Sequence, residues 1–326
     1  MRKRTRLILF LSLVAGLAAG TMAWQIAGAG KPASSSGLVQ TAAWVPRALV
    51  PTPRDPWPKL NPAKLTVRSN SALVADQATG QILYDKDADR ITPIASISKL
   101  MSAMVLLDSG VSLDEPETVT QDDVDTFKNS LSRLPVGWTL TRRELLQLAL
   151  MASENRAAAA LARTFPGGTR AFVAAMNAKA QALGMTHTHF LDPHGLHPDN
   201  VSTARDLFLM VKAAYGYDTI RTMTTTAQYQ ARALNTGRIR FFGNSNYLIY
   251  NDRWSIGLSK TGFINESGFC LVMEAQIMGR PVAMIFLDSA GKHTRQGDAA
   301  RVRQWLESGV SDVALGHHLQ RPHHAG

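Results

Sequence analysis

The pattern of apolar positions predicts strands near both ends of the chain. Ser71–Asp76 and Gln81–Tyr84 are short apolar runs separated by a glycine-containing turn, which predicts a β-hairpin. Gly268–Ile277 and Pro281–Asp288 form a second pair of apolar runs around another glycine-containing turn. These two predicted hairpins lie far apart in the sequence, so a sheet that contains both would be assembled from the two ends of the chain.

The segment between the hairpins, residues 93–232, is predicted to be mostly helical. Its clearest helix start is Thr141, which is followed three residues later by Glu144 and then by apolar residues, the spacing of a capping box. Asp298–Leu306 predicts a closing helix after the last strand. Strands at both ends with helices between them predict an α+β fold, an antiparallel sheet combined with a mostly helical subdomain.

The first 62 residues differ in character from the rest of the chain. Residues 1–23 carry four cations, then the apolar run Leu7–Ala19, then small residues, which is the pattern of a secretory signal peptide. If this segment is not cleaved, it could serve as a membrane anchor. Residues 24–62 are rich in Pro, Ala and Ser and predict a disordered linker. The folded domain is therefore expected at residues 63–310, followed by a flexible tail at 311–326.

Composition and charge narrow the class of protein. Apolar residues make up 45% of the chain and charged residues 18%, which is enough apolar material for a substantial core. Without the four cations of the predicted signal peptide, the formal net charge falls from +10 to +6. This moderate charge fits a solvated basic surface or attraction to an anionic polymer. Nucleic acid is not an expected partner, because an exported protein is separated from the nucleic acid of the cell. The sequence also has no stripe of basic and aromatic residues.

The single cysteine, Cys270, excludes an internal disulfide. It lies within the apolar run Phe269–Met273. We therefore interpret it as a buried structural thiol and not as a nucleophile.

The most informative short motif is Ser96-Ile-Ser-Lys99, which follows Pro93 at a predicted helix start. Residues three apart lie on one side of a helix, so the Lys99 amine can reach the Ser96 hydroxyl. A serine hydroxyl needs a nearby base to become a nucleophile, and a lysine with a lowered pKa can be that base. The same spacing recurs in Ser289–Lys292, but this copy contains a glycine and follows a strand, so we interpret it as a turn.

Two further motifs follow in the chain. Ser153-Glu154-Asn155 lies at the junction of two helical patterns, where Ser and Asn are also common as plain capping residues. Lys260-Thr261-Gly262 lies in a predicted strand, where a cation and a hydroxyl can meet a carboxylate and the glycine lets a substrate backbone approach. Each motif alone is weak.

The order and spacing of the three motifs resemble those of penicillin-binding proteins and serine β-lactamases. The resemblance covers about Leu65 to Glu307 and is greatest to the low-molecular-weight D-alanyl-D-alanine carboxypeptidases and endopeptidases. Two stretches, Ala149–Ala162 and Ala175–Leu207, look most similar to the endopeptidases of the penicillin-binding protein 7 type. The resemblance implies a β-lactamase/transpeptidase-like fold and a serine hydrolase that acts on D-Ala bonds of peptidoglycan in the periplasm.

The resemblance also implies catalytic roles for four residues. Ser96 would attack the carbonyl of a D-Ala residue and form an ester, with Lys99 as the proton acceptor. Ser153 and Asn155 would pass a proton to the leaving group and hold the substrate amide. β-Lactam antibiotics would be covalent inhibitors at the same serine.

Four further residues are implied in substrate binding. Lys260 and Thr261 would bind a substrate carboxylate, and Lys260 would also support Ser153. Gly262 would admit the substrate backbone, and the N–H groups of Ser96 and Phe263 would form the oxyanion hole.

No cofactor or metal is expected. Histidines cluster in the segment 187–197, but neither an H-E-x-x-H pattern nor a closed ligand spacing is present. The clustered histidines are His187, His189, His194 and His197. The histidines of residues 317–324 are expected to be solvated.

Several functions stay open at the level of sequence. The leading hypothesis is a DD-endopeptidase that cuts cross-links between D-Ala and a diamino acid. A DD-carboxypeptidase that releases terminal D-Ala uses the same chemistry. A non-catalytic peptidoglycan-binding protein and a β-lactamase are weaker alternatives. The oligomeric state is not predicted by the sequence.

Overall fold

The computed structural model describes Trp57 and residues 60–318. The predicted signal peptide 1–23 lies outside these residues, as do most of the predicted linker and the end of the predicted tail. Among the described helices, none combines the length and the apolar character needed to cross a membrane.

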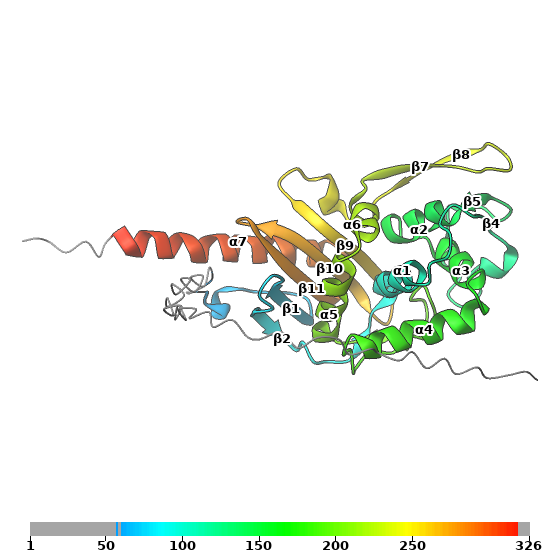
Figure 1. Ribbon diagram of the computed structural model, residues 1–326. Coiled ribbons are helices and arrows are strands. Elements are labelled where there is room, and N and C mark those ends of the chain that lie inside the picture. Colours follow the sequence, from blue (N-terminus) through cyan, green and yellow to red (C-terminus); the bar gives the residue numbers. More distant parts are fainter. Residues whose placement is uncertain (1–56, 58–59, 319–326) are drawn as a thin grey trace, which may run out of the picture. The chain divides into compact units, whose positions relative to one another are not determined.

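A five-stranded antiparallel sheet joins the two ends of the described chain (Figure 1). The first hairpin is β1 (Ser71–Asp76) and β2 (Ile82–Lys86), and the last three strands are β9 (Ser255–Ile264), β10 (Gly268–Ile277) and β11 (Arg280–Ser289). The strand order is β2-β1-β11-β10-β9, so β1 pairs with β11. Both predicted hairpins and the predicted α+β fold are confirmed.

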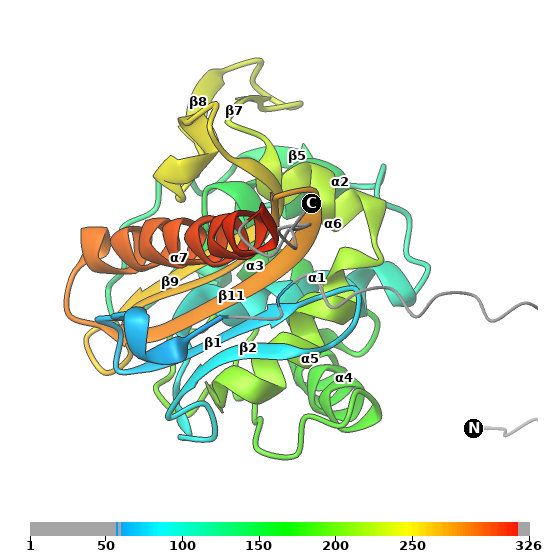
Figure 2. The ribbon, with the colours of Figure 1, turned by 90° about the vertical axis from the view of Figure 1, so that its left-hand side faces the viewer.

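The two faces of the sheet contact different helices, because successive side chains of a strand point to opposite faces. In β1, Leu73 and Ala75 belong to the core on the side of the helical region, whereas Ala72 and Val74 pack on the side of α7 (Lys292–His318). Figure 2 shows α7 lying across one face of the sheet, with α5 on the opposite side. Strand β1, which lies between β2 and β11, is therefore buried on both faces.

The helical region lies between the hairpins, as predicted. Its helices are α1 (Lys99–Asp108), α2 (Arg142–Met151), α3 (Asn155–Arg163), α4 (Gly168–Ala182), α5 (Ala204–Tyr215) and α6 (Asp218–Thr225). Thr141 caps α2 through the predicted capping box with Glu144. Short strand pairs complete the region: β3 (Thr92–Pro93) with β6 (Val201–Ser202), β4 (Pro116–Thr118) with β5 (Thr139–Thr141), and β7 (Gln228–Arg232) with β8 (Ile239–Gly243).

Two element boundaries differ from the expectation. Trp57, inside the predicted linker, is buried, and its indole N–H donates a hydrogen bond to Asp76 at 2.9 Å. The expected closing helix 298–306 is part of α7, which begins at Lys292 and continues to His318, into the expected tail. Proline is absent from residues 292–318, so no missing N–H interrupts the helix there.

Candidate active site

Ser96 lies in a 3₁₀ turn (η2, Ala95–Ser98) that leads directly into α1. Lys99 is the first residue of α1, and its side chain is almost completely buried. The Lys99 Nζ lies 2.7 Å from Ser96 Oγ, so the turn brings the amine onto the hydroxyl as the spacing predicts.

The Lys99 amine has two other polar contacts. Its Nζ lies 2.7 Å from Asn155 Oδ1 and 2.7 Å from the carbonyl oxygen of His194. Burial lowers the pKa of Lys99 to about 7, although the carboxylates of Asp192 and Glu154 act in the opposite direction. Ser96 Oγ in turn donates a hydrogen bond to the same His194 carbonyl oxygen at 3.2 Å. In its neutral form, the Lys99 amine has a lone pair that can accept the proton of Ser96.

Ser153 and Asn155 lie at the junction of α2 and α3, as the helical patterns predict. Ser153 has a φ of 60°, in the left-handed region that few non-glycine residues adopt. Its hydroxyl accepts a hydrogen bond from Lys260 Nζ at 2.8 Å, and Asn155 Nδ2 donates to Ser130 Oγ at 2.9 Å. The strained junction therefore directs both side chains to the same cleft.

The opposite wall of the cleft is strand β9, which carries Lys260, Thr261 and Gly262. Lys260 is fully buried, and burial together with the nearby charges of Lys99 and Arg295 holds the pKa of its amine well below the ordinary value. Thr261 Oγ1 donates to Ser245 Oγ at 2.8 Å. Arg295 from α7 donates to the carbonyl oxygen of Gly262 at 2.8 Å, and burial lowers its pKa to about 10.

Two glycines allow the backbone to close around the nucleophile turn. A Cβ on Gly262 would lie 2.8 Å from the carbonyl oxygen of Ile94 and 3.3 Å from Ser96 N. Gly195 has a φ of +81°, and a Cβ there would lie 1.9 Å from the carbonyl oxygen of Ala95. Ser96 is thus held between β9 and the loop that contains Gly195, with its backbone N–H beside the strand.

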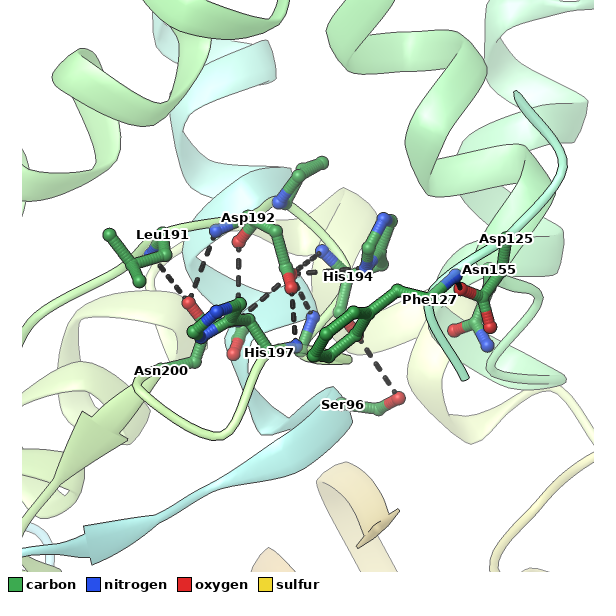
Figure 3. Close-up of polar contacts among 12 residues, drawn as sticks. Ser96, Asp125, Phe127, Asn155, Leu191, Asp192, His194, His197 and Asn200 are labelled. Carbon is green, nitrogen blue, oxygen red and sulfur yellow. Dashed lines mark hydrogen bonds and ion pairs between the residues drawn. The ribbon is translucent and has the colours of Figure 1, made fainter. Parts of the chain in front are cut away.

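The loop on the helical side is organised by Asp192 (Figure 3). Its carboxylate accepts hydrogen bonds from the backbone N–H groups of His194 and His197 at 2.9 and 2.6 Å, and from Asn200 Nδ2 at 2.8 Å. Burial by itself raises the pKa of this carboxyl, but the contact with His194 and the backbone N–H groups hold it well below its usual range. The loop thereby fixes the His194 carbonyl that Lys99 contacts.

A cleft of about 400 Å³ separates the two walls. Six of the eight residues named from sequence line this cleft, and Lys99 and Lys260 lie buried behind Ser96 and Ser153. The six are Ser96, Ser153, Asn155, Thr261, Gly262 and Phe263.

Sequence reasoning missed several groups at the site. Ser130 lies in an irregular segment, and Arg295 lies in the last helix, so neither stands in a motif. Asp192 precedes Pro193 and Gly195, a turn signal that could have marked an ordered loop. The backbone carbonyl of His194 has no sequence signal at all, because any residue provides one.

The other interpretations of single residues can also be compared with the structure. Cys270 is buried, and burial raises the pKa of its thiol to about 11. Ser289–Lys292 connects β11 to α7 and is a turn. Within the described part of the chain, no group of three or more His, Cys, Asp or Glu side chains is placed to hold a metal ion.

Comparison with known proteins agrees with this geometry. The family model described as D-alanyl-D-alanine carboxypeptidase, of the peptidase S11 family, matches residues 59–291. The chain therefore belongs to this family of peptidases.

The degree of similarity can be given for individual proteins. A D-alanyl-D-alanine endopeptidase of Pseudomonas aeruginosa is 46% identical over 269 residues, which cover 81% of this chain and 87% of the relative. A D-alanyl-D-alanine endopeptidase of Escherichia coli is 46% identical over 78% of this chain and 84% of its own length. Among solved structures, the Streptomyces K15 DD-transpeptidase is similar with a TM-score of 0.70 and 31% identity, over 74% of this chain and 98% of its own.

Proposed function

We propose that this protein is a serine D-alanyl-D-alanine endopeptidase, which hydrolyses D-Ala cross-links of peptidoglycan through an ester on Ser96. The observation that carries the proposal is the contact of Lys99 Nζ with Ser96 Oγ at 2.7 Å, with the pKa of the amine lowered to about 7. A base with a pKa near the working pH is well suited to take a proton from a hydroxyl. The two endopeptidase relatives at 46% identity support the choice of substrate.

In acylation, Ser96 Oγ bonds to the carbonyl carbon of the D-Ala residue while its proton moves to the lone pair of Lys99. The carbonyl oxygen becomes an oxyanion, for which the N–H groups of Ser96 and Phe263 are the proposed donors. The close approach of β9 to Ser96 N at Gly262 supports this role.

Collapse of the intermediate breaks the C–N bond, and the leaving amine needs a proton. Ser153 is the proposed donor, because its hydroxyl contacts Lys260 Nζ, which can replace the proton. Asn155 would hold the substrate amide. Water then hydrolyses the ester, releases the shortened peptide and restores the Ser96 hydroxyl.

In both candidate substrates the leaving amine has a carboxylate on the same carbon. In a carboxypeptidase substrate this carbon belongs to the terminal D-Ala, and in a cross-link it belongs to the D-configured end of a diamino dicarboxylic acid. Lys260, Thr261 and Arg295 gather two cationic groups and a hydroxyl at one end of the cleft. A carboxylate that binds there would restore positive charge on groups whose pKa values are lowered in its absence.

Action on the cell wall requires export from the cytoplasm. The pattern of residues 1–23 supports a periplasmic location, with an uncleaved membrane anchor as the alternative. β-Lactams are the proposed covalent inhibitors, because they present a reactive acyl group and a carboxylate to the same cleft.

The test is mass spectrometry after exposure to penicillin. We expect one covalent adduct in the wild-type protein and none in Ser96→Ala, with Ser289→Ala as the matched control at the second S-x-x-K. An adduct that survives in Ser96→Ala would show that the nucleophile is a different residue. Cross-linked muropeptide dimers then report the substrate: release of monomers supports an endopeptidase, whereas release of free D-Ala alone contradicts it.

A further inference from the structure

An ion pair that the proposed reaction does not use lies at the edge of the cleft. Lys128 lines the cleft, and its amine pairs with the carboxylate of Glu266. Lys128 comes from the segment between η3 (Gln121–Asp123) and β5, and Glu266 comes from the turn between β9 and β10. The pair therefore connects the helical wall with the strand wall.

Both partners stand on ordered turns. The carboxylate of Asp125 accepts hydrogen bonds from the backbone N–H groups of Phe127, Lys128 and Ser130 at 2.9, 3.0 and 2.7 Å. The Phe127 ring stacks on His197 with centroids 5.3 Å apart and an interplanar angle of 8°, and Figure 3 shows this ring above Ser96. These contacts fix the backbone at Lys128, and the Lys128 side chain lines the cleft.

The turn that carries Glu266 is equally well held. The buried Ser267 hydroxyl accepts from the N–H of Ile264 at 3.1 Å and donates to the carbonyl oxygen of Gly268 at 2.8 Å. Glu266 is exposed on this turn, and its neighbour Asn265 lines the cleft. Two ordered turns therefore present one positive and one negative charge across the opening.

The position of the pair relative to the proposed reaction follows from strand β9. The leaving-group carboxylate is assigned to Thr261 and the oxyanion to Phe263, so the chain that remains on the enzyme extends toward the end of β9. At about 3.3 Å per residue, Ile264 lies about 10 Å beyond Thr261. Lys128 and Glu266 thus face the acyl segment of the substrate, on the side opposite the leaving group.

We propose that Lys128 and Glu266 form a subsite for the zwitterionic end of a side chain in the acyl segment, an ammonium and a carboxylate on the same carbon. Lys128 would bind the carboxylate and Glu266 the ammonium, so that the internal ion pair is exchanged for two pairs with the substrate. An ion pair that is open to solvent contributes little to stability, so opening it opposes binding only weakly. A diamino dicarboxylic acid carries such an end when its side chain is not itself cross-linked.

This inference rests on the proposed function and adds a selectivity to it. The enzyme would favour cross-links whose acyl-donor stem has a free diamino acid end. Peptides in which that amine is acylated, as in a stem cross-linked on both sides, or in which that carboxylate is amidated, would be poorer substrates.

The test uses four synthetic peptides with the same D-Ala bond and the same leaving group. They differ only at the side-chain end of the residue before D-Ala, which carries both charges, the ammonium alone, the carboxylate alone, or neither. We expect wild-type kcat/KM to be about tenfold higher for the zwitterionic peptide than for the uncharged one. Lys128→Ala should lose the part of this preference that depends on the carboxylate, and Glu266→Gln the part that depends on the ammonium.

The controls separate this inference from the function on which it rests. Asp114→Ala breaks the exposed ion pair between Arg143 and Asp114, neither of which lines the cleft, and should keep the full preference. Equal kcat/KM for all four peptides, or an unchanged preference in both cleft variants, would overturn the subsite while a normal penicillin adduct on Ser96 upholds the proposed function. Loss of both peptide cleavage and adduct in the wild type would overturn both.

Discussion

The two walls of the cleft each hold a buried lysine beside a serine, but in opposite electrostatic surroundings. On the helical wall, Lys99 contacts Ser96, and the carboxylates of Asp192 and Glu154 raise its pKa against the effect of burial. On the strand wall, Lys260 contacts Ser153, and its charged neighbours are cations that lower its pKa further.

This difference separates the proposed roles of the two amines. Lys99 has a pKa of about 7, so at neutral pH both its protonated and its neutral form are present, as a general base requires. Among the described residues, the charged groups that shift the pKa of Lys260 are the cations Lys99 and Arg295, and a substrate carboxylate would supply the missing anion. The helical wall is thus poised for proton transfer, whereas the strand wall is poised to bind an anion.

Replacing the base should have the largest effect. In Lys99→Met, the amine is lost while most of the buried volume is kept, so acylation of Ser96 by a β-lactam should slow by about 10³-fold. The rate of adduct formation by stopped-flow or mass spectrometry measures this. The exposed Lys212 offers a control, because Lys212→Met removes an equal charge on α5 outside the site. Acylation within tenfold of wild type would show that Lys99 is not the base.

Replacing the other lysine should have a smaller effect that depends on the substrate. In Lys260→Met, kcat/KM should fall by about 10²-fold for a peptide whose leaving residue has a free carboxylate, since charged hydrogen bonds are worth about 1.5–3 kcal/mol. The loss should be smaller when that carboxylate is amidated. Equal losses on the two peptides would mean that Lys260 acts only through Ser153, and the contrast between the walls would no longer hold.

The sequence was sufficient for several elements of the fold and for the places of the three motifs. Short apolar runs around glycine-containing turns predicted both hairpins, and the Thr141 capping box predicted the start of α2. The three motifs predicted their places as well: Ser96 at a helix start, Ser153 at a helix junction and Lys260 on a strand. Local patterns succeed here because each motif depends on its own element.

The surroundings of the lysines could not be predicted in the same way. Asp192 orders the loop whose His194 carbonyl contacts Lys99, and this order depends on backbone hydrogen bonds. Arg295 contacts Gly262 from a helix on the other face of the sheet. Trp57 falls in the predicted linker because prolines surround it, yet its indole finds Asp76 in the folded domain. These contacts join distant segments, and no local periodicity encodes them.

The smallest expected effect tests the electrostatic side of the comparison directly. Acylation by the wild-type enzyme should rise about tenfold per pH unit below neutrality and level off above about pH 7, because only neutral Lys99 can accept the proton of Ser96. Glu154→Gln removes a negative charge that raises this pKa, so the rising limb should move to lower pH.

Glu154 is a better site for this test than Asp192, because Asp192 organises the loop and its replacement would disturb the His194 carbonyl. The amide oxygen of the Glu154→Gln side chain would keep an acceptor for the backbone N–H of Arg133, which Glu154 now binds at 3.1 Å. The pH profile of adduct formation gives the result, with Asp114→Asn as a remote loss of charge. If the rising limb moves to higher pH in Glu154→Gln, the carboxylates of the helical wall do not set the proton affinity of Lys99. The two walls would then differ in the position of their lysines but not in electrostatics.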